Sequence, residues 1–120
     1  MATAANVLVA VVALEHVWFL VLEAFLWTKP LGLKTFHQSP EKAATTAVLA
    51  VNQGVYNGFL AAGLVWGLLA AAPFAASIKV FFLACVVVAA IVGGLTVSAR
   101  ILAVQGVPAA IGLVLVLLSR

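Results

Sequence analysis

The sequence predicts an all-α membrane protein, a compact bundle of four transmembrane helices with a short fourth helix. Hydrophobic residues make up 67% of the chain and charged residues 8%, and the mean hydropathy is +1.31, far from the composition of soluble domains. The apolar residues also fall into four runs separated by polar or proline-containing stretches. At roughly 20 residues per span, the chain holds about four spans in a single domain, residues 1–120.

The first span is predicted at about residues 4–27. Its ionisable residues are Glu15, His16 and Glu23. A secretory signal peptide is the competing interpretation, but no basic residue precedes the apolar run, and no small-residue cleavage site precedes its aromatic cluster. We therefore expect this segment to be retained as a membrane span.

One extended polar loop is predicted at about residues 28–44. At its end, Ser39, Pro40 and Glu41 form the pattern of a helix start. Serine caps a helix, proline suits the first helical position, and a glutamate in the first turn complements the helix dipole. The second helix is therefore expected to begin near Pro40 and to cross the membrane at about residues 45–69.

The third span is predicted at about residues 78–98, or to residue 104 if the helix continues past Arg100. The fourth apolar run contains only about residues 108–118. At about 1.5 Å per residue, this run is shorter than a hydrocarbon layer of roughly 30 Å. Either the fourth helix starts earlier or the bilayer thins around it.

The basic residues predict an orientation. With alternating spans, four of them share one side of the membrane and two lie on the other: Lys29, Lys34, Lys42 and Arg100 against Lys79 and Arg120. This places the loop at 28–44 in the cytoplasm and both termini outside, across the cytoplasmic (inner) cell membrane. The net charge of +3 then anchors the protein to the lipid bilayer. We expect no nucleic-acid partner, because no basic face of sufficient size exists.

The ionisable residues of the first span lie on one side of its helix. At about 100° per residue, Glu15, His16, Phe19, Glu23 and Trp27 fall within about 120°. A charged group near the bilayer centre costs at least about 2.5 kcal/mol on insertion scales, so such residues are a hypothesis of function by default.

The second span carries a matching polar stripe of Asn52, Gln53, Tyr56 and Asn57, which fall within about 140° of one another. If Trp27 and Thr45 mark the same membrane interface, the two helices pair in an antiparallel register. That register brings Glu23 near Val48 and Ala50, and Glu15 with His16 near Tyr56 and Asn57. The two stripes would then form one buried polar site.

In this predicted site, Glu15 is the proton acceptor at the membrane midplane, and His16 and Glu23 are its partners along the stripe. The orienting hydrogen-bond donors are Asn52, Gln53, Tyr56 and Asn57. The function we favour is the binding or translocation of a proton, an ion or a small amphipathic molecule.

Two other classes of function stay open. In a structural or scaffold protein, the polar residues only join helices, helped by Gly54, Gly58 and Gly63, which let helices approach closely. A membrane enzyme is the third class, although we assign no catalytic residue and no cofactor. We assign no metal site, because the chain has two histidines and His37 lies in the loop, which leaves a poor ligand set for zinc.

Two further interactions are predicted. Arg100 lies close in depth to Glu23, so it either forms an ion pair with this residue or extends to the lipid headgroups. A homodimer is also predicted, because four short helices enclose little volume for a pathway.

Several strings of residues resemble a known family. They are Ala13-Leu14-Glu15-His16, Leu22 to Thr28, Asn52 to Gly63, and Gln105 to Ala109. Together they resemble the small bacterial membrane proteins called domain of unknown function 1304, over nearly the whole chain. The resemblance implies a compact four-helix integral membrane protein and carries over no activity.

A second likeness is architectural. Four spans and an acidic residue in the first helix look like the small multidrug resistance transporters, which exchange protons for lipophilic cations as dimers. The second acid, the histidine, the longer first loop, the amide-rich second helix and the stunted fourth helix depart from that pattern. A proton-coupled exporter is therefore an alternative by analogy of fold and site.

Overall fold

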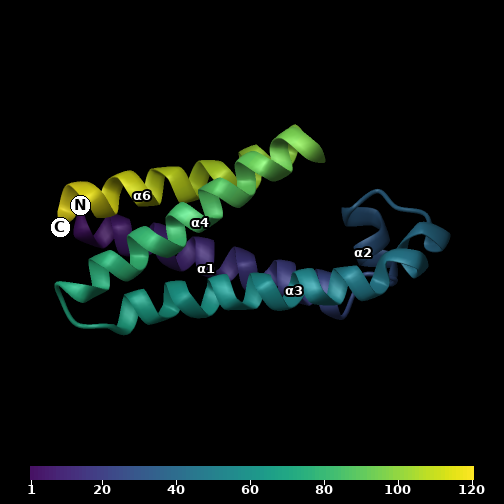
Figure 1. Ribbon diagram of the computed structural model, residues 1–120, viewed down its shortest axis with the longest axis horizontal. Coiled ribbons are helices and arrows are strands. Elements are labelled where there is room, and N and C mark those ends of the chain that lie inside the picture. Colours follow the sequence, from purple (N-terminus) through teal and green to yellow (C-terminus); the bar gives the residue numbers. More distant parts are fainter. The chain divides into compact units, whose positions relative to one another are not determined.

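A computed structural model describes residues 1–120 and contains only helices and connecting turns (Figure 1). The elements are α1 (Ala2–Ala24), α2 (Pro30–Thr35), α3 (Pro40–Leu69), α4 (Phe74–Thr96), α5 (Ala99–Ile101), the π-helical turn η1 (Leu102–Gly106) and α6 (Val107–Ser119). Four helical segments are long and apolar enough to cross a membrane. The predicted all-α membrane fold class is confirmed.

The second long helix begins where the sequence indicates. α3 starts at Pro40, with Glu41 in its first turn. The backbone N–H of Lys42 donates to Ser39 Oγ at 3.2 Å, which satisfies one of the N–H groups that a helix start leaves without a partner. The predicted cap at Ser39 is confirmed.

The last helical segment begins earlier than residue 108, which is the first of the two alternatives given by the sequence. α5, η1 and α6 follow one another from Ala99 to Ser119, 21 residues in all. Ser98 caps this segment, because its side chain accepts a hydrogen bond from the backbone N–H of Arg100. At about 1.5 Å per residue, the segment reaches about 30 Å. The third predicted span does not continue to residue 104, the alternative end given by the sequence, because α4 ends at Thr96.

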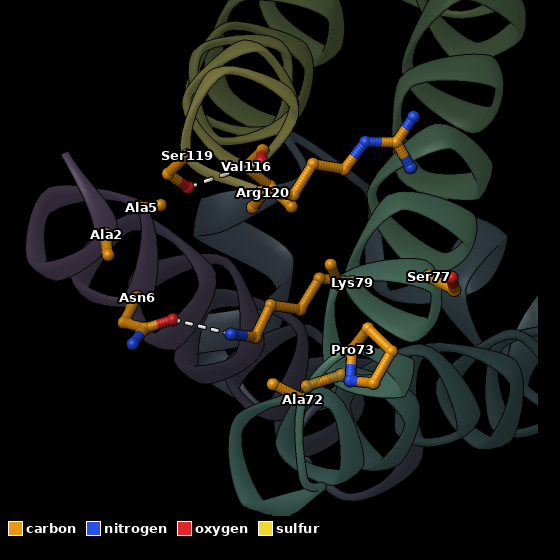
Figure 2. Close-up of a pocket in the computed structure, with 12 residues that line it drawn as sticks. Ala2, Ala5, Asn6, Ala72, Pro73, Ser77, Lys79, Val116, Ser119 and Arg120 are labelled. Carbon is orange, nitrogen blue, oxygen red and sulfur yellow. Dashed lines mark hydrogen bonds between the residues drawn. The ribbon is translucent and has the colours of Figure 1, made fainter.

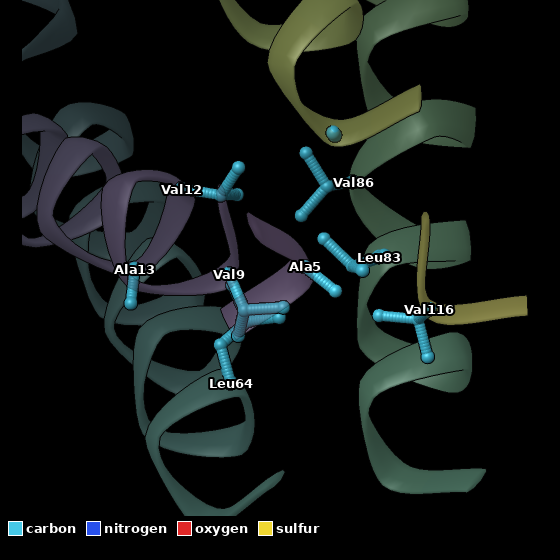
Figure 3. Close-up of a cluster of buried hydrophobic side chains, with 9 residues drawn as sticks. Ala5, Val9, Val12, Ala13, Leu64, Leu83, Val86 and Val116 are labelled. Atoms are coloured by element: carbon cyan, nitrogen blue, oxygen red, sulfur yellow. The ribbon is translucent and has the colours of Figure 1, made fainter. Parts of the chain in front are cut away.

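The chain divides into two compact units. The first unit contains Met1–Glu15 and Leu60–Arg120, and the second contains His16–Phe59. In the first unit, buried side chains from α1, α3, α4 and α6 form the core (Figure 3). The fully or almost fully buried members include Val9, Val12, Leu64, Leu83, Val86 and Val116. In a membrane protein, close van der Waals packing of this kind holds helices together.

In the second unit, α1 and α3 approach each other through glycines of α3. A Cβ added at Gly54 would lie 3.2 Å from the backbone nitrogen of Ala24, and one at Gly58 would lie 2.7 Å from Leu20 Cδ1. The two glycines form a G-x-x-x-G pair, which permits close helix contact. A side chain at Gly54 would crowd the backbone of α1 at Ala24, and one at Gly58 would displace the Leu20 side chain.

The turn after α1 is fixed by aromatic and backbone contacts within the second unit. Trp27 Nε1 donates to Thr46 Oγ1 at 3.1 Å, and the Trp27 ring lies 4.9 Å from that of Phe36, centroid to centroid. Gly32 of α2 is buried directly against the backbone carbonyl of Leu26. The segment predicted as a polar loop therefore contains the short helix α2, which packs against the turn after α1 at Gly32 and at its C-cap Phe36.

Candidate functional site

A partly buried carboxyl–amide pair joins α1 to α3 in the second unit. Asn57 Nδ2 donates a hydrogen bond to Glu23 Oε1. Asn57 is 6% exposed, whereas Glu23 is half-buried. The second carboxyl oxygen, Glu23 Oε2, makes no hydrogen bond within the chain. One oxygen is therefore held by the protein, and the other can accept a proton or contact a cation.

The glycines of α3 explain how this pair forms. Asn57 lies beside Gly58 and one turn after Gly54, on the face of α3 that packs against α1. Because these glycines bring the backbones of the two helices together, the short side chain of asparagine reaches Glu23. A buried amide also needs a partner, and the carboxyl group supplies one.

His16 is a second ionisable residue of this unit and is fully buried, at 0% exposure. Its ring contacts the ring of Phe19 edge to face, with centroids 5.2 Å apart. It precedes Glu23 by about two helical turns, which is about 10 Å along the axis. Both residues lie on the same side of α1 as predicted from the periodicity, but Phe19 and Leu20 occupy the turn between them.

Three of the four hydrogen-bond donors predicted for the site do not lie at the carboxyl group of Glu23, which corrects the predicted donor set. Asn52, Gln53 and Tyr56 are exposed, and Asn52 Nδ2 donates to the Val48 carbonyl of its own helix at 3.1 Å. Of the polar stripe on α3, only Asn57 reaches the carboxyl group of Glu23. The physical reason is that the buried face of α3 is defined by small residues. A stripe of about 140° extends well beyond that face.

The predicted register is also wrong by about two helical turns. The sequence placed Glu23 near Val48 and Ala50, but Glu23 bonds Asn57, and Ala24 lies against Gly54. α1 ends at Ala24, so Trp27 reaches Thr46 from a turn instead of from the helix. Trp27, which was used to set the register of α1, therefore lies outside that helix.

Glu15 and Arg100 belong to the first unit. Glu15 is half-buried, and its Oε1 is buried without a hydrogen-bond partner. Its role as a midplane proton acceptor stays a prediction. Arg100 is exposed and lies in α5, and its pairing with Glu23 also stays a prediction.

The first unit contains a cavity of about 620 Å³ near the ends of α1, α4 and α6 (Figure 2). Lys79 Nζ donates to Asn6 Oδ1 at 2.7 Å, a contact not predicted from the sequence although each polar residue lies near the start of a predicted span. The Arg120 side chain points away from the Lys79 ammonium group (Figure 2). Alanines supply much of the remaining lining.

Nowhere in the chain do three or more His, Cys, Asp or Glu side chains converge as a metal site requires.

Comparison with known proteins gives a family and one curated relative. The family model described as "Protein of unknown function (DUF1304)" matches residues 10–117, a range that includes Glu23 and Asn57. The uncharacterized protein YpaA of Lactococcus lactis subsp. lactis (strain IL1403) is 28% identical over 102 residues, which cover 83% of this chain and 85% of that protein. No solved structure matches the chain.

Proposed function

Because this chain belongs to the DUF1304 family of proteins of unknown function, we propose its function from its own residues. The protein binds or translocates a proton, an ion or a small amphipathic molecule in the membrane. The carboxyl group of Glu23 is the group that takes up a proton or a small cation.

The observation that carries this proposal is the bond from Asn57 Nδ2 to Glu23 Oε1. An amide donor orients the carboxyl group without neutralising it, since asparagine carries no charge. The unbonded Oε2 can take up a proton while the amide bond to Oε1 remains in place. Ionisable residues inside membrane proteins are typical of ion pathways and proton relays.

The proposed topology places this site toward the cytoplasmic side of the inner (cytoplasmic) membrane. The bias of basic residues supports a cytoplasmic position for the segment of residues 28–44 and an outside position for both termini. Under this topology, Glu23 lies near the end of α1 that faces the cytoplasm.

Proton flux into reconstituted vesicles tests the proposal. Wild-type protein, Glu23→Gln and Glu41→Gln are each reconstituted with an internal pH-sensitive dye, and the internal pH is followed after an external pH step. Glutamine keeps an oxygen that can accept from Asn57 but cannot exchange a proton, so we expect Glu23→Gln to reduce the flux to that of protein-free vesicles. Glu41 is exposed in the first turn of α3, and its substitution is expected to leave the flux unchanged.

A structural role is the second candidate function, and the close packing of α1 on Gly54 and Gly58 favours it. Under this alternative, the carboxyl–amide pair only joins the helices. Wild-type vesicles would then show no flux above protein-free vesicles, or the same flux as Glu23→Gln vesicles. Either result contradicts the proposed proton site. Adding a lipophilic cation on one side tests the exporter alternative, which requires proton flux coupled to cation movement.

A further inference from the structure

The outward face of α3 carries three polar side chains, Asn52, Gln53 and Tyr56, all of them exposed. They lie in the middle of a 30-residue helix, each at least about 18 Å along the axis from either end. Large apolar side chains flank them on the exposed surface of α3, including Val48 at 76%, Leu49 at 68% and Phe59 at 60% exposure. The polar groups therefore interrupt a surface that is otherwise suited to lipid.

These side chains have hydrogen-bonding groups that the chain does not satisfy. The Gln53 amide makes no hydrogen bond within the chain, and Asn52 uses one N–H on its own helix. Tyr56 contacts the ring of Phe59 edge to face, and its hydroxyl group makes no hydrogen bond. Lipid tails offer no partner to such groups, so exposure to hydrocarbon is costly for them.

We propose that this face of α3, named here the amide face and defined by Asn52, Gln53 and Tyr56, binds a second copy of the chain. Amide and phenol groups both donate and accept hydrogen bonds. The same face can therefore satisfy itself across a two-fold axis, as an isologous interface requires.

Charge and helix packing also favour a second copy. The charged residues of α3, Glu41 and Lys42, lie in its first turn, at least about 15 Å along the axis from Asn52, so the amide face itself carries no charge. The G-x-x-x-G pair, Gly54 and Gly58, is already occupied by α1 of the same chain and is not available to a partner. Association through the amide face leaves the contact between α1 and α3 unchanged.

Disulfide cross-linking of the full chain in lipid bilayers tests the interface. Cys85, the single cysteine, is first replaced by alanine. Leu49→Cys then places a thiol beside the amide face, and Val88→Cys places one on a similarly exposed position of α4, 60% exposed against 68% for Leu49. We expect an oxidant to give cross-linked dimer with Leu49→Cys at least about five times faster than with Val88→Cys. Equal rates at the two positions would overturn the proposal.

A second arm tests whether the polar groups drive association. Asn52→Leu, Gln53→Leu and Tyr56→Phe are combined in the Leu49→Cys background, and each is also made alone. We expect the combined variant to weaken dimerisation by about tenfold or more, and each single variant to weaken it partly, because interhelical hydrogen bonds contribute modestly one by one. The substituted positions are exposed, so helicity and thermal stability of the single variants serve as the folding control. A dimer that persists in every variant would overturn the proposal.

Discussion

Replacing Gly32 with alanine is expected to lower the free energy of unfolding by about 3 kcal/mol, the upper end of the range for overpacking. A Cβ at this position would overlap the carbonyl oxygen of Leu26 and lie 3.1 Å from the Cα of Trp27. Both are backbone atoms of the turn after α1, so no side chain can rotate away. Unfolding of the purified protein in mixed micelles, followed by circular dichroism, measures the loss.

Gly112→Ala is the matched control for this prediction. A Cβ there would meet Leu8 Cβ at 3.4 Å and the Leu83 methyl groups at 3.7 Å, which are ordinary contact distances. Alanine in a helix is favoured over glycine by roughly 0.5–1 kcal/mol, so this variant is expected to be as stable as the wild type or slightly more stable. Equal losses in both variants would show that Gly32 does not pack against the turn as described.

Asn57→Leu is expected to lower the free energy of unfolding by about 1–3 kcal/mol, because it removes the donor and leaves a half-buried carboxyl oxygen without its partner. The same unfolding measurement applies. Asn52→Leu is the control, measured in dilute detergent to keep the chains separate. Its amide bonds only to the carbonyl of its own helix, so we expect a change below about 0.5 kcal/mol. A neutral Asn57→Leu would contradict the bond between Asn57 and Glu23.

Much of the fold could be predicted from the sequence, because membrane spans are set by composition and length over many residues. The start of α3 at Pro40 could also be predicted from the sequence, since helix capping depends on local residue types. The start of α5 at Ala99 was missed, although Ser98 supplies a cap signal of the same kind. The π-helical turn η1 then continues the helical segment up to α6. Because Pro108 was taken to separate two segments, this continuity was not predicted.

The residues of the site were easier to predict than their partners. Glu23 and Asn57 were both selected as polar residues in apolar helices, but their direct pairing was not predicted. Helix rotation was set by Gly54 and Gly58, whose packing role outweighs the polar pattern. A stripe of four polar residues therefore divided into one buried donor and three exposed groups. Periodicity alone cannot decide which edge of such a stripe faces the neighbouring helix.

Infrared difference spectroscopy of the reconstituted protein between acidic and alkaline pH tests the central claim, that Glu23 exchanges a proton while bonded to Asn57. We predict a carboxyl C=O band that titrates with pH in the wild type, disappears in Glu23→Gln and shifts in frequency in Asn57→Leu. The band should be unaffected in Glu41→Gln. Spectra of Glu23→Gln and wild-type protein that are identical across the pH range would contradict the claim.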